Sequence, residues 1–210
     1  MARSAASPLE TLAEVARQLA AAHGNPRARS GLALPSLLYL SDSVRSPEPV
    51  RVARELPAGT GVVLRHYDHP QRRALAMELS AVCKAGGLTL LIGADPALAK
   101  DVDADGVHWP ERLLADAAAE GRWRIVTAAV HGAAGLQAAA AAQCDAALLS
   151  PIFASASHAG APQLGVPEFS RLVDQAALPV FALGGVTAGN AAELLGSGAA
   201  GIAAIGAFAR

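Results

Sequence analysis

Residues 124–149 read RIVTAAVHGAAGLQAAAAAQCDAALL, and this stretch has the pattern of a strand, a helix and a second strand. Short apolar runs at Arg124–Ala128 and Ala146–Leu149 enclose an alanine-rich stretch of helical length, Ala133–Gln143. The apolar runs do not alternate with polar residues, which is typical of strands buried on both faces of a parallel sheet. The stretch therefore predicts a β-α-β unit with a right-handed crossover.

The same alternation extends in both directions along the chain. Eight short apolar runs are the expected strands: Leu37–Leu40, Gly61–Arg65, Leu88–Ile92, Gly106–His108, Arg124–Ala128, Ala146–Leu149, Val180–Leu183 and Gly201–Ile205. The expected helices between them are Pro49–Leu56, Pro70–Ala85, Ala97–Val102, Arg112–Glu120, Ala133–Gln143, Val166–Ala176 and Ala188–Gly196. Eight units favour a closed (β/α)8 TIM barrel. An open doubly wound sheet is the alternative if one or two of these runs are not strands.

An additional helix is expected before the first strand. Apolar residues within Leu9–Leu19 fall on one face at helical spacing. Ser7 is a suitable N-cap for this helix, and Pro8 is a suitable first residue. We therefore divide the chain into an N-terminal helix and linker, residues 1–33, and a barrel, residues 34–210.

The composition limits the classes of partner. The 210 residues carry a formal net charge of −1 without a run of Lys or Arg, so binding to nucleic acid is not expected. No segment approaches the roughly 20 apolar residues that span a bilayer, so no membrane contact is expected. The two cysteines, Cys83 and Cys144, lack the spacing of metal ligands, and they predict packing roles in a reduced, cytoplasmic setting.

Two glycine-bearing turns follow the expected seventh and eighth strands. Gly184-Gly185 lies in the first turn, and Ile205-Gly206 lies in the second. Many TIM barrels bind a phosphate at this place through backbone N–H groups and a helix N-terminus, and glycine lets the anion approach the backbone closely. Gly184, Gly185, Ile205 and Gly206 are therefore candidate phosphate-binding residues. A tight strand-to-helix turn without a ligand is the alternative explanation of the double glycine.

Several motifs, in matching order, resemble those of the thiamine phosphate synthase and TenI family. They are Ser150-Pro151-Ile152-Phe153 with the loop that continues to His158, Leu183-Gly184-Gly185-Val186 with Asn190, Ala104-Asp105-Gly106-Val107-His108, Leu64-Arg65, and Val130-His131-Gly132. The resemblance extends from about Leu37 to Phe208. It implies a barrel, a thiazole-phosphate-like ligand, a role in thiamine biosynthesis and a homodimer.

The magnesium site that the resemblance implies is altered in this chain. The family holds Mg²⁺ with an Asn-Asp pair after strand three and an acid after strand four, where Gly93-Ala94 and Leu113 stand here. Asp95 and Glu111 lie nearby. They are expected to bind Mg²⁺ only if the chain is a thiamine phosphate synthase, which couples hydroxymethylpyrimidine diphosphate to thiazole phosphate and releases pyrophosphate. Otherwise no cofactor is expected.

Two lysines of the family motifs are also replaced, by Tyr67 and His158, and two threonines of the same loop are replaced by Ser155 and Ser157. Each missing lysine weakens the stabilisation of a departing pyrophosphate, by an amount on the order of 3 kcal/mol for a well-placed group. The turns for a monophosphate are retained. The pattern therefore favours a TenI-like thiazole tautomerase, which moves a proton and needs no metal.

The tautomerase hypothesis needs one general acid/base. The resemblance points to His131, because an imidazole both accepts and donates a proton near neutral pH. Arg65 is the candidate for binding a carboxylate or phosphate of the ligand, and Ser155, Ser157 and His158 are candidates for contacts from the loop. Three other interpretations stay open: the synthase, a non-catalytic binding or regulatory protein for a thiamine precursor, and an unrelated phosphate-ligand enzyme.

Overall fold

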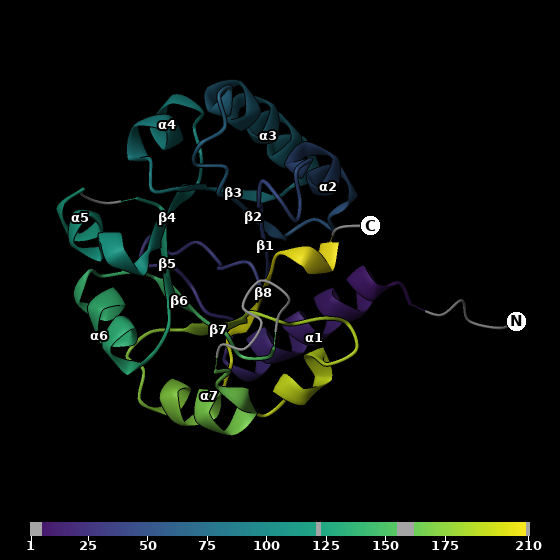
Figure 1. Cartoon of the computed structure of the whole chain (residues 1–210), viewed down its shortest axis with the longest axis vertical. Helices are drawn as coiled ribbons and strands as arrows, with labels where there is room; N and C mark the ends of the chain where they lie inside the picture. The colour runs from purple at the N-terminus through teal and green to yellow at the C-terminus, as the bar shows by residue number, and fades with distance from the viewer. Residues whose placement is uncertain (1–5, 121–122, 155–161, 209–210) are drawn as a thin grey trace, which may run out of the picture.

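The computed structural model describes residues 6–120, 123–154 and 162–208, and they form a closed barrel of eight parallel strands (Figure 1). Each strand pairs with the next along the chain, and the last pairs with the first. The strands are β1 Leu37–Leu40, β2 Gly61–Leu64, β3 Thr89–Gly93, β4 Gly106–Pro110, β5 Ile125–Val130, β6 Ala146–Leu149, β7 Val180–Leu183 and β8 Gly201–Ala204. The predicted TIM barrel is confirmed, and every expected strand is present with bounds shifted by two residues or fewer.

Helices cover the outside of the barrel. They are α1 Pro8–Ala22, α2 Pro49–Glu55, α3 Arg72–Gly86, α4 Pro96–Asp101, α5 Leu114–Ala119, α6 Ala133–Ala141 and α7 Gly165–Asp174. Short 3-10 turns lie at η1 Glu111–Leu113, η3 Ala191–Leu194 and η4 Gly206–Phe208.

The helix predicted at Ala188–Gly196 is wrong, since only the 3-10 turn η3 forms there. The side-chain oxygen of Asn190 accepts a hydrogen bond from the backbone N–H of Thr187, which holds the chain in a turn at that point. Gly196 has a φ of +83°, which ends any continuation as a helix. A prediction from alanine content alone is therefore wrong here, because the hydrogen bond of Asn190 and the positive φ of Gly196 outweigh helix propensity.

Helix α1 packs against β1 and β8, beside which Figure 1 shows it. Its N-terminus has the predicted cap: the Ser7 hydroxyl accepts from the Glu10 N–H, and the Glu10 carboxylate accepts from the Ser7 N–H. Leu12 and Leu19 are buried in the same core cluster as Phe208 at the other end of the chain. Only the 3-10 turn η4 is described after β8. Helix α1 packs on β8 and β1 and so covers the side of the barrel where an eighth helix would pack. The division at residue 33 stays a prediction.

The amino-terminal end of the barrel is closed by the segment between α1 and β1. The buried carboxylate of Asp145, just before β6, accepts hydrogen bonds from the backbone N–H of Arg29 and of Val126. Ala28 and Leu34 are buried in the cluster that fills the barrel interior. The opposite end, at the carboxyl ends of the strands, therefore carries the open cavity.

Both cysteines have the packing roles predicted for them. Cys83 in α3 and Cys144 before β6 are free and buried. Burial raises the pKa of the Cys83 thiol to about 12 and that of the Cys144 thiol to about 11, so both stay protonated. Within the described residues, no helix combines the length and the apolar character needed to cross a membrane.

Candidate functional site

A cavity of about 700 Å³ opens at the carboxyl ends of the barrel strands. Residues that follow every strand except β3 contribute to its described lining. Among them are Arg65 after β2, Glu111 and Arg112 after β4, and His131 after β5. This is the end of a TIM barrel where active sites are found, because loops from separate strands meet there.

Both glycine turns line this cavity, since Gly184, Gly185, Ile205 and Gly206 all face it. Gly184 and Gly185 have φ values of +92° and +72°, which disfavour other residues. A Cβ on Gly184 would lie 2.8 Å from the Cα of Pro151, so the turn packs directly on the segment after β6. The structure thus brings the four predicted phosphate-binding residues to one wall of one cavity.

The turn after β7 is held in shape by Asn190. The side-chain N–H of Asn190 donates to the carbonyl of Gly185 at 2.9 Å, and its side-chain oxygen accepts from the Thr187 N–H at 2.7 Å. The neighbouring turn after β8 leads into η4, which begins at Gly206. Free N–H groups at the start of such a turn are suited to an anion.

His131 forms a close pair with Glu111. Its Nδ1 lies 2.7 Å from Oε2 of Glu111, and its backbone N–H donates to the same oxygen at 2.9 Å. A Cβ on Gly135 would lie 2.8 Å from the Glu111 carboxylate, so the small residue in α6 makes room for it. A carboxylate at Nδ1 favours the tautomer with the proton on Nδ1, which leaves Nε2 as the basic nitrogen.

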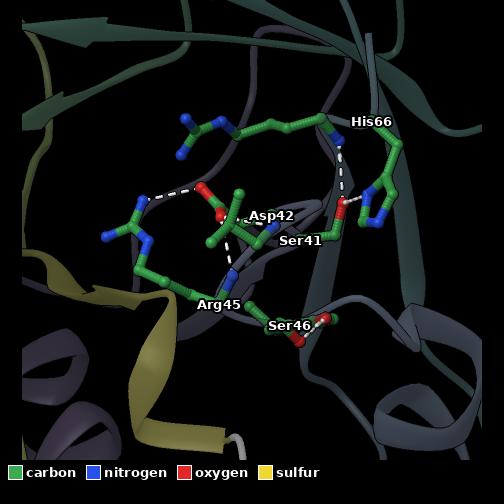
Figure 2. A network of polar contacts seen from close by, with 8 residues as sticks. Ser41, Asp42, Arg45, Ser46 and His66 are labelled. Atoms are coloured by element: carbon green, nitrogen blue, oxygen red, sulfur yellow. Dashed lines mark hydrogen bonds and ion pairs between the residues drawn. The ribbon is translucent and has the colours of Figure 1, made fainter. Parts of the chain in front are cut away.

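The ends of β1 and β2 are joined through Ser41 (Figure 2). Its hydroxyl oxygen accepts from the backbone N–H of Arg65 at 2.9 Å and lies 2.9 Å from Nδ1 of His66. Ser41 and His66 are both buried. Burial, followed by the neighbouring His69, lowers the pKa of His66. This contact fixes the backbone from which the Arg65 side chain leaves the strand.

The loop after β1 presents Arg45 to the cavity. The Asp42 carboxylate accepts from the guanidinium of Arg45 at 2.7 Å and from the backbone N–H of Arg45 at 2.9 Å (Figure 2). These hydrogen bonds, with a further one from the Val44 N–H, hold the pKa of Asp42 well below its usual range. Asp42 therefore orders the loop as a charged group.

The residues near β3 do not fit the magnesium site that the family resemblance implies. One oxygen of Asp95 caps α4 by accepting from the Leu98 N–H at 2.9 Å, and the other accepts from Arg72 at 2.7 Å. A second N–H of Arg72 donates to the Gly93 carbonyl at 2.6 Å. Within the described residues, no group of three or more His, Cys, Asp or Glu side chains could hold a metal. Asp95 lies outside the described cavity lining, and Glu111 is engaged by His131.

Sequence reasoning placed some site residues and missed others. Arg65 and His131 line the cavity as predicted, whereas Ser155, Ser157 and His158 lie outside the described residues. Arg45 and Arg112 line the cavity and were missed. The signal that could have found Arg112 is its position two residues after the end of β4. His108 is a buried core residue, with Nδ1 2.9 Å from the Thr127 hydroxyl oxygen.

Comparisons with known proteins agree with this architecture. A family model described as thiamine monophosphate synthase matches residues 42–208. The thiamine-phosphate synthase of Thiobacillus denitrificans is 34% identical over 178 residues, which cover 78% of this chain and 82% of that protein. The thiamine-phosphate synthase of Thioalkalivibrio sulfidiphilus is 33% identical over 173 residues, with 78% and 82% covered. The structure of a thiamine phosphate pyrophosphorylase from Pyrococcus furiosus is similar with a TM-score of 0.68 and 24% identity, over 80% of this chain and 84% of that chain, which shows the fold.

Proposed function

The chain belongs to the thiamine monophosphate synthase and TenI family, and from that membership we propose that it acts on a thiazole phosphate by general acid/base proton transfer. The observation that carries the proposal is a single cavity that combines the two glycine turns with the His131–Glu111 pair. The phosphoryl group of the ligand binds at Gly184, Gly185, Ile205 and Gly206. This orientation places its ring in the cavity that His131 lines.

In the proposed reaction, Nε2 of His131 accepts a proton from one ring atom of the thiazole and returns it to another. Glu111 holds Nδ1 and stabilises the transient imidazolium, so the histidine passes through the reaction in one orientation. The ligand enters and leaves with the same atoms and the same charge. The proposed reaction is therefore an isomerisation, and it needs no metal ion.

The first test is the exchange of His131. His131→Ala is expected to lower kcat for the tautomerisation of a thiazole phosphate carboxylate about 100-fold or more, the usual contribution of a positioned acid/base. Glu111→Gln is expected to lower kcat by about tenfold while KM is largely kept, because the imidazole loses its charged partner. His23→Ala is the matched control, since His23 is exposed on the amino-terminal side of β1 and outside the cavity lining. Turnover by His131→Ala at the rate of the unchanged protein would refute the role of His131.

Thiamine-phosphate synthase is the second candidate, and the names of the curated relatives favour it over proton transfer. Both carboxylate oxygens of Asp95 already accept hydrogen bonds, one from Arg72 and one from the Leu98 N–H, which argues against a synthase that works through magnesium. The two candidates are separated by supplying hydroxymethylpyrimidine diphosphate with thiazole phosphate and measuring pyrophosphate release. Release of pyrophosphate with formation of thiamine phosphate would replace the first proposal by the second. Binding of thiazole phosphate without turnover in either assay would point to a binding or regulatory protein.

A further inference from the structure

We infer that Tyr67 forms an aromatic platform on which a planar heteroaromatic ring of the ligand stacks, and that Arg72 is a positioning residue for this platform. The inference deepens the proposed function and rests on it for the phosphoryl end of the ligand, because it assigns the residue that selects the ring. A thiazole and a pyrimidine share the required ring chemistry, and the experiment below separates them.

Tyr67 brings an aromatic side chain to a cavity whose described lining holds no other Phe, Tyr or Trp. The Tyr67 side chain is 38% exposed, whereas Trp109 of β4 is buried and belongs to the core cluster. An exposed ring in a cavity offers a flat apolar face, and aromatic rings prefer to pack on such a face in an offset stack. Tyr67 is therefore the residue in this lining that distinguishes an aromatic ligand from an aliphatic one.

A tight turn after β2 places the ring of Tyr67 at the rim of the cavity. The backbone N–H of Tyr67 donates to the carbonyl of Arg65 at 2.6 Å, so the chain turns at His66. His66 is buried, and its Nδ1 lies 2.9 Å from the hydroxyl oxygen of Ser41, which ties this turn to the end of β1. Arg65 and Tyr67, on either side of His66, both line the cavity.

Gly93 at the end of β3 makes room for the edge of the ring. A Cβ on Gly93 would lie 3.0 Å from Cε1 and 3.1 Å from the hydroxyl oxygen of Tyr67. Any side chain at this position would therefore crowd the ring. With glycine there, the ring edge rests against the backbone of β3.

Arg72 covers one face of the ring and is itself held in place. The central carbon of its guanidinium lies 5.6 Å from the centroid of the Tyr67 ring. One guanidinium nitrogen donates to Asp95 at 2.7 Å, and a second donates to the Gly93 carbonyl at 2.6 Å. Its Nε is buried and has no hydrogen-bond partner among the described residues, so the electron-rich face of the ring compensates the charge on that side. Because Arg72 is anchored, the ring keeps one orientation.

The platform lies within reach of a ligand whose phosphoryl group binds at the two glycine turns. Tyr67 follows β2 and Gly206 follows β8, and β1 is the one strand between β2 and β8 in the closed barrel. Neighbouring strands are about 4.8 Å apart, so β2 and β8 are separated by roughly 10 Å. A ring joined to a phosphoryl group by a short linker spans this separation, so one ligand contacts both places.

The test is a calorimetric titration with three probes: a thiazole phosphate, hydroxymethylpyrimidine phosphate, and hexyl phosphate, which has no ring. The unchanged protein is expected to bind at least one aromatic probe about tenfold more tightly than hexyl phosphate, the usual contribution of one stacked ring. Tyr67→Leu is expected to remove this preference and to keep the affinity for hexyl phosphate, which also shows that the variant folds. Tyr67→Phe is expected to keep the preference, because the ring is retained.

Met77→Leu is the matched control for these variants. Met77 is an exposed apolar residue of α3 outside the cavity lining, so its exchange is expected to leave all three affinities unchanged.

The role of Arg72 is tested by a double-mutant cycle. Arg72→Gln is expected to weaken binding of the aromatic probe about threefold, because the ring loses its cationic support. In a protein that already carries Tyr67→Leu, the same exchange is expected to change nothing further, since Arg72 acts through the ring. Additive losses would refute the positioning role.

A spectroscopic measurement reports on the ring directly. Tyr39, the second of the two tyrosines, is buried in β1, so ligand stacking is expected to change the near-ultraviolet circular dichroism of Tyr67. This tyrosine signal is expected to be lost in Tyr67→Phe although the aromatic probe still binds.

Four outcomes would overturn the inference. They are no binding of any probe, equal affinity of the unchanged protein for aromatic and hexyl phosphates, equal losses for both kinds of probe in Tyr67→Leu, and a loss in Tyr67→Phe as large as that in Tyr67→Leu. The aromatic probe whose affinity falls in Tyr67→Leu identifies the ring as a thiazole or a pyrimidine.

The same series separates the inference from the proposed function. His131→Ala is expected to lose turnover and to keep the preference for the aromatic probe, because His131 is not part of the platform. If the pyrimidine probe alone depends on Tyr67, the platform stands and the proposed reaction on a thiazole loses its support. Conversely, an active tautomerase that binds hexyl phosphate as tightly as a thiazole phosphate would refute the platform alone.

Discussion

At the scale of single residues, the pairing of Glu111 with His131 is the contact on which the proposed proton transfer depends. The register places Pro110 of β4 opposite Ala129 of β5, so the residues that follow these strands leave the barrel side by side. Glu111, which was expected to bind Mg²⁺ only if the chain is a synthase, is thereby directed to an imidazole. A carboxylate bound to Nδ1 is the arrangement that orients a histidine for acid/base chemistry.

His108 gives a prediction for stability at low pH. Burial, followed by the charge of Arg65, lowers its pKa to about 3 from an ordinary value of 6.5. The unfolded chain therefore binds a proton between these values that the folded chain does not, so the free energy of unfolding falls as pH drops below 6.5.

His108→Gln removes this titration and is expected to reduce the slope of unfolding free energy against pH, between about pH 4 and pH 6, by up to ~1.4 kcal/mol per pH unit. Glutamine keeps a polar group near Thr127 while it cannot take up a proton. Urea unfolding at several pH values measures the slope. Equal slopes for the variant and the unchanged protein would show that His108 is protonated in the folded state.

At the scale of elements, α1 is stabilised at its start by its own side chains and along its length by the barrel. Its Ser7 hydroxyl satisfies a backbone N–H that the first turn of a helix otherwise leaves unbonded. Its apolar face, including Leu12 and Leu19, is buried against the strands. The N-cap at Ser7 and the burial of the apolar face both stabilise the helix that begins at Pro8.

Ser7→Ala is expected to lower the free energy of unfolding by about 1 kcal/mol, the usual cost of losing a hydroxyl cap. Ser170→Ala in α7 is a matched control, since the Ser170 hydroxyl forms no hydrogen bond within the described chain and alanine favours a helix. Thermal or urea unfolding monitored by circular dichroism measures both. A loss at Ser170 as large as that at Ser7 would show that the cap does not contribute specifically.

At the scale of the whole molecule, the barrel closes one end and leaves the other for ligands. The segment before β1 seals the amino-terminal end through Arg29 and Asp145, while the strand ends on the other side carry glycines and arginines. The barrel can close only if neighbouring strands approach each other closely. The contact of Gly106 with the paired strand is an example. A Cβ on Gly106 would lie 1.9 Å from the carbonyl oxygen of Ile125 on the paired strand.

Gly106→Ala is therefore expected to destabilise the barrel by about 3 kcal/mol or more, because the β4 and β5 backbones would have to separate. Gly189→Ala is the control, since the nearest atom to its Cβ would be 3.8 Å away and its φ is not positive. The midpoint of urea unfolding compares the two. Similar midpoints for both variants would contradict the close approach of the strands at Gly106.

The homodimer implied by the resemblance stays a prediction.

The order of strands and helices could be predicted from sequence because it is a local property. Apolar runs and alanine-rich stretches repeat along the chain, and the capping residues of α1 lie within three positions of each other. Local sequence signals also predicted that the glycine turns follow β7 and β8 and that His131 follows β5. They failed at η3, where the backbone N–H of Thr187 donates to the side-chain oxygen of Asn190 and Gly196 has a positive φ, so a 3-10 turn forms in place of a helix.

What the sequence by itself determined is the barrel, its amino-terminal helix and the family motifs at the strand ends. Only the tertiary structure decided which charged groups meet: Glu111 binds His131 20 positions away, and Arg72 binds Asp95 23 positions away. The physical reason is that these two contacts depend on distances across the rim of a closed barrel. Such distances are set by strand register and not by any spacing along the chain, so the partners of Glu111 and Asp95 are visible only in three dimensions.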